Sequence, residues 1–178
     1  RADQRTGTGE RRSIVLADGT RIWLNTRTSL NVDDQGPLRR LVLLTGEILI
    51  ETALDRQQRP FYVETSFGRL QALGTRFTVR QTGPQSRLDV FDGAVEIRTA
   101  QGRIQRVHAG QAAQFDAATI APLGRADSGR EAWSRGRIQA EAMPLGNLLE
   151  ELNRYRHGHI SVAAEVADLK VMGVFPAD

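Results

Sequence analysis

The sequence of 178 residues contains no cysteine, a single lysine (Lys170) and three histidines. The absence of cysteine excludes disulfide bonds and thiolate metal sites, although it does not identify a cellular compartment. No run of apolar residues approaches the roughly 20 that a membrane-spanning helix needs. The opening residues Arg1–Arg5 do not resemble a signal peptide, and we expect the chain to be a portion excised from a longer protein.

Positive charge is carried almost entirely by arginine and is scattered along the chain. The formal net charge is +3, and the densest basic positions are the pairs Arg11-Arg12 and Arg39-Arg40. A nucleic-acid-binding domain usually gathers its basic residues on one face or along one helix. No such cluster is present in the sequence, so we expect no nucleic acid among the partners of this chain. Apolar residues make up 40% and charged residues 25%, as in a folded globular protein rather than a disordered one.

Apolar and polar residues alternate over most of residues 13–115, with the spacing of two that is typical of half-buried β-strands. The clearest stretch is Phe61–Phe77, in which glycines separate the alternating runs. Asp18-Gly19 and Asp92-Gly93 lie between such runs and predict β-hairpins. The irregular spacing of the glycines does not support a fixed-period repeat protein. We therefore predict a mainly β fold, an antiparallel all-β sandwich or solenoid-like domain of short strands followed by a small βαβ-type subdomain.

One predicted hairpin is apolar on both faces, which indicates a central position in the sheet. It joins Leu41–Leu44 to Ile48–Ile50 through Thr45-Gly46, and a strand that is apolar on both sides must be covered on both sides. The carboxylates within the predicted strands are expected on solvent faces. They are Glu47, Glu51, Glu64, Asp89, Asp92 and Glu96.

The alternation is lost over Ala117–Arg130, where Pro, Gly, Asp and Ser predict a linker. Ile138–Ala142 then predicts a short strand, and a helix is expected to open at Pro144. Ile160–Ala163 and Val171–Phe175 predict two further strands. We accordingly divide the chain into an all-β domain (1–122), a linker (123–132) and a partial βαβ subdomain (133–178).

No set of residues in the sequence indicates catalysis. The serines lie in no nucleophile-elbow context, and Gly74-Thr75-Arg76 lacks the lysine and helix of a phosphate loop. His157 and His159 have no evident third metal ligand, and the end of a helix explains them better. Asp33-Asp34 is typical of a solvated turn rather than of a calcium site. We predict that the protein is not an enzyme and has no catalytic, cofactor-binding or metal-binding residues.

Binding of another protein is the remaining function, and the predicted helix supplies the candidate contacts. Its leucines recur at i, i+3, i+4 and i+7, the spacing of one amphipathic stripe, and two aromatic residues flank them. The candidate partner-binding residues are Trp133, Leu145, Leu148, Leu149, Leu152 and Tyr155. Core packing explains the leucines equally well, and an exposed strand edge of the β domain is an alternative docking surface.

Several motifs, in this order, resemble the periplasmic region of the FecR/PupR family of transmembrane sigma-factor regulators. In the β part they are Leu16–Asn25, Ser29-Leu30, Arg40–Glu47, Arg59–Phe61, Ala72–Phe77, Asp92–Val95 and Gly110-Gln111. In the tail, Trp133, Gly136, Pro144-Leu145, Leu152–Tyr155 and Gly173–Phe175 resemble the start of a short secretin/TonB N-terminal (STN) domain. The tail departs from that domain, because the second helix and last strands of the family fold do not follow Phe175.

The resemblance implies a role that the periodicity does not show. Members of the family carry a cytoplasmic anti-sigma segment and one membrane helix ahead of this region. The periplasmic region receives a signal from the N-terminal signalling domain of a TonB-dependent siderophore transducer, and regulated proteolysis by periplasmic and intramembrane proteases then frees the sigma factor. The resemblance implies no cofactor. Two alternatives are an all-β carbohydrate-binding module of the cell envelope, which requires a row of exposed aromatic residues, and a glycosidase, which requires a carboxylate pair.

Overall fold

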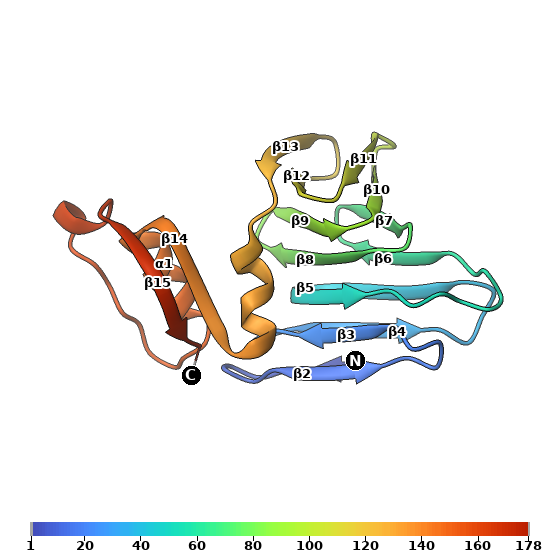
Figure 1. Cartoon of the computed structure of the whole chain (residues 1–178), viewed down its shortest axis with the longest axis horizontal. Helices are drawn as coiled ribbons and strands as arrows, with labels where there is room; N and C mark the ends of the chain where they lie inside the picture. Colours follow the sequence, from blue (N-terminus) through green and yellow to red (C-terminus); the bar gives the residue numbers. More distant parts are fainter. Residues whose placement is uncertain (1, 178) are drawn as a thin grey trace.

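The computed structural model describes residues 2–177, and most of this chain forms one strongly bent β-sheet whose two halves pack face to face (Figure 1). We call this part the sandwich. Its strands are β1 (Gln4–Arg5), β2 (Arg12–Val15), β3 (Arg21–Leu24), β4 (Ser29–Asp33), β5 (Arg39–Glu51), β6 (Phe61–Thr65), β7 (Gly68–Ala72), β8 (Arg76–Thr82), β9 (Gln85–Asp92), β10 (Ala94–Thr99), β11 (Ile104–His108), β12 (Gln111–Phe115) and β13 (Ile120–Arg125).

Strand β5 organises the sandwich because it belongs to both halves of the sheet. Its first half pairs with β4 and β6, and its second half pairs with β3 and β8. The main path of the sheet runs β11-β10-β7-β6-β5-β8-β9-β12-β13, and its pairs are antiparallel except β5–β6. The mainly β prediction is confirmed, and so is the central position of residues 41–50.

The prediction of a hairpin turn at Thr45-Gly46 is wrong, because the chain continues through Gly46 as a single strand of 13 residues. Gly46 has φ +97°, and a Cβ atom at this position would lie 2.3 Å from Oγ1 of Thr28. Glycine therefore lets the two chains cross closely where β5 passes from one half of the sheet to the other. Hydrogen bonds between Thr28 and the backbone of Glu47 fix this crossing.

The two Asp-Gly dipeptides have different roles. Asp18-Gly19 joins the paired strands β2 and β3, as predicted for a hairpin. Asp92-Gly93 joins β9 to β10, which belong to opposite halves of the sheet, so the hairpin prediction there is wrong. A Cβ on Gly93 would lie 2.0 Å from the carbonyl oxygen of Gly74, so close backbone approach explains this glycine.

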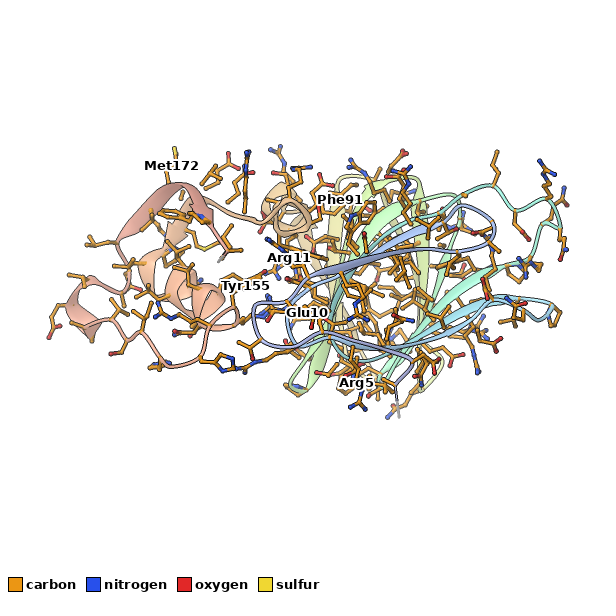
Figure 2. All side chains as sticks on the ribbon, turned by 90° about the horizontal axis from the view of Figure 1, so that it is seen from below. Arg5, Glu10, Arg11, Phe91, Tyr155 and Met172 are labelled. Carbon is orange, nitrogen blue, oxygen red and sulfur yellow. The ribbon has the colours of Figure 1, made fainter. Side chains whose placement is uncertain are left out.

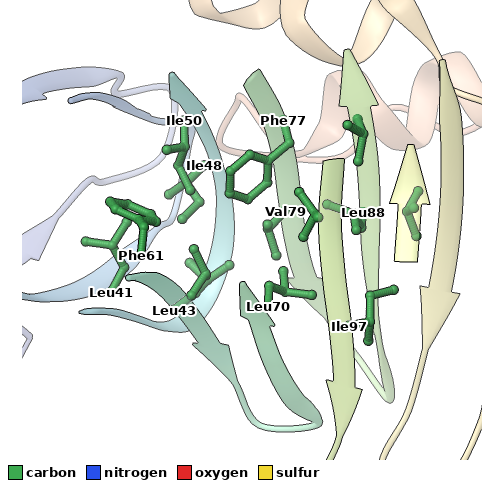
Figure 3. Close-up of a cluster of buried hydrophobic side chains, with 14 of the residues drawn as sticks. Leu41, Leu43, Ile48, Ile50, Phe61, Leu70, Phe77, Val79, Leu88 and Ile97 are labelled. Atoms are coloured by element: carbon green, nitrogen blue, oxygen red, sulfur yellow. The ribbon is translucent and has the colours of Figure 1, made fainter. Parts of the chain in front are cut away.

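An apolar core lies between the two halves of the sheet (Figure 3). It follows from the alternation of each strand, which places every second side chain on the inner face. Its fully enclosed members include Leu24, Leu43, Ile48, Ile50, Phe61, Leu70, Phe77, Val79, Leu88 and Ile97. Each such side chain contributes roughly 1.5–3 kcal/mol by burial, so this core is the main source of stability of the sandwich.

The residues after β13 form a 3₁₀ helix, η1 (Ser128–Arg135), and then a small lobe that we define as residues 137–177. The lobe contains β14 (Arg137–Pro144), α1 (Leu145–Asn153), η2 (Ala164–Val166) and β15 (Lys170–Pro176). The two strands pair antiparallel, and α1 packs against them. Figure 1 shows η1 between this lobe and the sandwich. The helix predicted after Pro144 is confirmed, and no helix of the described residues is long and apolar enough to cross a membrane.

Two local predictions after residue 116 differ from the structure. Ile160–Ala163 is not a strand, because the side chain of Asn153 exchanges hydrogen bonds of 2.8 Å with both backbone groups of Ile160. Ala117–Arg130 is not wholly a linker, because it contains β13 and the start of η1. As a largely exposed edge strand with a bulge opposite Ala112 and Ala113, β13 lacks the alternation that signals a strand. The domain boundaries at 122 and 133 stay a prediction.

Candidate functional site

The site with the most concentrated polar chemistry lies at the junction between the sandwich and the small lobe. Its floor is the outer face of β3, β5, β8 and β9, opposite the face that lines the sandwich core. Apolar residues fill one part of this junction and come from both sides. They are Trp23, Leu49 and Phe91 of the sandwich, Trp133 of η1, and Ile138, Ala140, Met143, Leu148, Leu152, Tyr155, Val171, Phe175 and Ala177.

Glu47 is the buried acidic centre of the junction, with only 1% of the residue exposed. Its Oε1 accepts hydrogen bonds from Asn25 Nδ2 at 2.8 Å and from Arg154 Nη1 at 3.2 Å. Asn25 Nδ2 also lies 2.7 Å from the hydroxyl of Tyr155. A side chain of β5 thus holds two consecutive residues of the small lobe, Arg154 directly and Tyr155 through Asn25.

Glu151 of α1 extends this ion-pair network to the neighbouring strand. It accepts from Arg154 Nη1 at 2.6 Å and from Arg80 Nη1 of β8 at 2.9 Å. Burial raises the pKa of the Glu151 carboxyl, but Arg154 and Arg80 outweigh burial and hold the pKa below its ordinary value. Burial also lowers the pKa of Arg154, yet Glu47 and Glu151 raise it overall. Both carboxylates therefore stabilise the charged form of Arg154.

Burial raises the pKa of the Tyr155 phenol, and the nearby Glu151 and Glu47 raise it further. The hydroxyl consequently stays protonated and neutral at physiological pH. A neutral phenol fits its place beside Asn25, since neither group adds a further charge to the junction.

The N-terminal segment before β2 also contacts the small lobe. Thr26 Oγ1 donates to the carbonyl oxygen of Arg154 at 3.0 Å and accepts from the backbone N–H of Gly9 at 2.9 Å. Gly9 has φ +75°, and a Cβ atom there would lie 2.7 Å from the carbonyl oxygen of Tyr155. Figure 2 shows Arg11, Glu10 and Tyr155 where the lobe meets the sandwich. The end of α1 is thereby joined to a segment about 145 residues earlier in the chain.

A polar cleft of about 440 Å³ opens beside this network, between β8–β9, η1 and the small lobe. Arg80, Arg87, Arg130 and Arg137 line it together with acidic residues and Gln114. Burial lowers the pKa of the Arg130 guanidinium, and the charge of Arg87 lowers it further. Burial and the neighbouring arginine therefore both disfavour the charged form of Arg130 in this cleft.

The structure places the predicted partner-binding residues in two groups. Trp133, Leu148 and Tyr155 are buried in the junction, and Leu152 packs against the same cluster. Leu145 and Leu149 are half-buried on α1. Three of the six thus have little surface to offer a partner while the lobe is docked, and their role in binding stays a prediction.

Two buried carboxylates of the junction are not identified by the sequence analysis. Glu47 and Asp89 were expected on solvent faces, but both are buried, so that prediction is wrong for them. The small lobe and η1 cover the outer face of the sheet, and Asp89 is held by Arg87 at 2.7 Å. A signal for Glu47 was present, since it lies within the strand that was expected to be covered on both sides.

The histidines and carboxylates of the described residues give no indication of a metal site. His157 and His159 are exposed after the end of α1, and His159 lies 3.2 Å from the side chain of Asn153. No group of three potential His, Asp or Glu ligands gathers anywhere in residues 2–177.

The outer strand of the small lobe offers a different kind of surface. Within residues 2–177, β15 pairs with β14 alone, which leaves its second edge open. Met172 and Val174 of β15 are 77% and 59% exposed, and the adjoining Leu169 is exposed as well. An open strand edge with exposed apolar side chains is typical of a surface that accepts another strand.

These features define a class of protein: a β-sandwich module whose small lobe is docked through a buried ion-pair network and carries an open strand edge. A profile of the family described as FecR protein matches residues 2–96. The chain therefore belongs to the FecR protein family, and it is a module of a signalling regulator. The family match ends within β10, so it does not include the small lobe.

Solved structures show that the complete fold occurs elsewhere. Two crystal structures of a protein from Parabacteroides distasonis, whose proposed role is that of an anti-sigma factor, are similar to this chain with TM-scores of 0.78 and 0.77. Each is 20% identical in sequence, and each alignment covers 98% of this chain and 84% of the other. The shared fold therefore includes the docked lobe. No curated protein matches the sequence.

Proposed function

We propose that this chain is the signal-receiving periplasmic region of a sigma-factor regulator and acts by binding rather than by catalysis. Its partner is the N-terminal signalling domain of a TonB-dependent outer-membrane transducer, and binding promotes the regulated proteolysis that frees the sigma factor. Membership of the FecR family supports this role, and the structural likeness to a proposed anti-sigma factor agrees with it.

The observation that carries the proposal is the open edge of β15. Leu169, just before β15, and Met172 and Val174 of β15 are exposed apolar residues within six consecutive positions, whereas the exposed leucines and valines of the sandwich occur singly along the sequence. A partner strand added to this edge would gain backbone hydrogen bonds, and its alternate side chains could contact Met172 and Val174.

The junction supplies a route from that surface to the rest of the regulator. β15 pairs with β14, and α1 packs on both strands. The residues at the end of α1 are hydrogen-bonded to Glu47 and Thr26 and lie against Gly9. A partner that displaced or tightened the lobe would therefore act on the N-terminal segment, which in the family follows the membrane helix. The carbohydrate-binding alternative has less support, because Trp133 is buried and Trp23 packs into the junction.

Calorimetric titration of the 178-residue chain with the signalling domain of the transducer encoded beside it tests the proposal. We expect binding by the wild type, at least a tenfold loss of affinity in Met172→Asp, and no change in Leu54→Asp. Leu54 is a matched control because it is 97% exposed and lies in a loop of the sandwich. Circular dichroism should show that both variants are folded.

Leu149→Glu tests the original helix hypothesis in the same titration. Loss of binding in a folded Leu149→Glu variant, with Met172→Asp unaffected, would move the docking surface from β15 to α1. Absence of binding by the folded wild-type chain would contradict the proposed partner.

A further inference from the structure

The cleft beside the ion-pair network contains more hydrogen-bond donors than the protein uses, and this surplus is independent of the proposed protein partner. The cleft has a volume of about 440 Å³, and its walls come from the sheet, η1 and the small lobe. A ligand held there would touch every part that meets at the junction.

Strand register places the arginines of the sheet side by side. Glu47 of β5 is opposite Arg80 of β8, Arg80 is opposite Arg87 of β9, and Arg87 is opposite Gln114 of β12. Two guanidinium groups directly opposite each other on one face of an antiparallel pair repel, unless anions separate or neutralise them. Arg130 of η1 lines the same cleft. Burial lowers the pKa of its side chain, and the charges of Arg87 and Arg80 lower it further.

The carboxylates of the cleft neutralise these arginines unevenly. Arg87 is bound by Asp89 through Nε and Nη2, and Arg80 is bound by Glu151 through Nη1. Within residues 2–177, the ion pairs of the Arg130 guanidinium are two long ones, with Glu47 at 3.9 Å and with Asp127 at 3.7 Å. Both distances exceed those of hydrogen bonds, so the guanidinium N–H groups lack a close acceptor in this part of the chain.

Each acidic partner of Arg130 is held by hydrogen bonds to its other carboxylate oxygen. Oε1 of Glu47 accepts from Asn25 and Arg154, and Oδ1 of Asp127 accepts from the backbone N–H of Gly129 as the N-cap of η1, while Oε2 and Oδ2 face Arg130 at the longer distances. The side chain of Arg130 is nevertheless largely enclosed, with 24% exposed, so water reaches only part of it. Trp133, which also lines the cleft, buries an indole N–H that has no hydrogen-bond partner among the described residues.

We propose that this cleft binds a small ligand through an oxyanion group, a phosphate or a carboxylate, that the guanidinium of Arg130 recognises with help from Arg80 and Arg87. A guanidinium presents five N–H donors in a planar fork that matches the oxygens of either group. Arg137, the first residue of the small lobe, lines the same cleft and adds a further positive charge that attracts the ligand. Because the other three arginines belong to η1 and the sheet, a bound ligand would connect the lobe to the sandwich and hold it in its docked position.

Tryptophan fluorescence provides a direct test, because Trp133 lines the cleft and Trp23 lies in the same junction. The 178-residue chain is titrated at constant ionic strength with inorganic phosphate and, separately, with succinate, with sodium chloride as the salt control. We expect saturable binding of at least one oxyanion and none of chloride. Saturation by phosphate alone or by succinate alone would identify which oxyanion group the ligand carries.

Variants separate a specific site from general attraction of anions. Arg130→Gln should weaken binding at least tenfold, whereas Arg106→Gln, at an exposed position on β11, should leave it unchanged. If Arg130→Gln is unfolded by circular dichroism, Arg137→Gln replaces it, with a smaller loss expected. No saturable signal with either oxyanion, or equal affinities of wild type and a folded Arg130→Gln variant, would overturn the proposal.

Discussion

The two apolar clusters of this molecule differ in what accompanies their side chains. The sandwich core consists of aliphatic and aromatic residues that are at most 2% exposed. The junction cluster mixes its apolar residues with Glu47, Arg154, Glu151 and the hydroxyl of Tyr155. The stability of the sandwich core depends on its buried apolar area, because the hydrophobic effect is not directional. The stability of the junction depends also on the distances and charges of its polar groups.

The difference suggests that the sandwich serves as a scaffold and that the junction can respond to a signal. Buried ion pairs contribute less net stability than apolar packing, but they fix a particular arrangement and are lost when one partner changes. Both tryptophans lie in the junction and none in the sandwich core, so fluorescence follows the junction while far-ultraviolet circular dichroism follows the β-sheet.

The largest effect is expected from Phe77→Ala in the sandwich core. Phe77 is fully enclosed between the two halves of the sheet, so its truncation leaves a cavity and should lower the free energy of unfolding by about 3–5 kcal/mol. Urea unfolding should show both signals moving together to lower denaturant. Leu54→Ala, at an exposed loop position, is the control and should change stability by less than about 0.5 kcal/mol.

A smaller loss is expected from Glu47→Gln in the junction. The substitution keeps the shape but removes the charge that holds Arg154 and faces Arg130, which should cost about 2 kcal/mol. Fluorescence should change at lower urea than circular dichroism, because the lobe loosens before the sandwich unfolds. Coincident transitions would show instead that the two regions unfold as one cooperative unit.

Much of the sandwich could be predicted from the sequence because its core obeys one simple rule. Alternating side chains in β6 to β10 identify the inner face without knowledge of strand order. The path of the chain could not be predicted in the same way. Gly46 and Gly93 look like turn glycines, yet both allow close contacts with residues that are distant in the sequence, Thr28 and Gly74.

The junction was predicted far less well, since its charged residues become neighbours only through folding. The spacing of the leucines identified α1, but nothing local links Glu151 to Arg80, which lies 71 positions away, or Arg154 to Glu47, which lies 107 positions away. Sequence periodicity reports which face of a strand is apolar. It cannot report which polar residues on the other face will be covered.

The hydroxyl of Tyr155 contributes one neutral hydrogen bond to the junction. Tyr155→Phe keeps the ring in the junction but removes the partner of Asn25, and we expect a loss of about 1 kcal/mol. Asn25 retains its bond to Glu47, which is why the effect should be smaller than that of Glu47→Gln. Thermal unfolding measures the change. A loss as large as that of Glu47→Gln would mean that the hydrogen bond between Asn25 and the Tyr155 hydroxyl holds the lobe as strongly as the ion pair does.

The smallest expected effect concerns Glu151 and is a change in how the stability of the junction depends on pH. Its pKa in the folded protein lies below the ordinary value of 4.5, because Arg154 and Arg80 outweigh burial. The carboxylate therefore contributes stability that is complete above pH 4.5, and this contribution is lost as the pH falls through the lower folded-state value. On acidification, tryptophan fluorescence should change before circular dichroism in the wild type.

In Glu151→Gln the group no longer titrates, so the fluorescence of the junction should depend less on pH in the acid range. Asp116→Asn is the matched control, because the pKa of Asp116 is also lowered, by hydrogen bonds from Ala118 and Thr119 in a turn of the sandwich. That substitution should flatten the acid dependence of circular dichroism and leave the earlier change in fluorescence in place. If Glu151→Gln instead retained the wild-type separation of the two signals in acid, another group would be responsible for holding the lobe, and the network around Glu47 would be the next place to look.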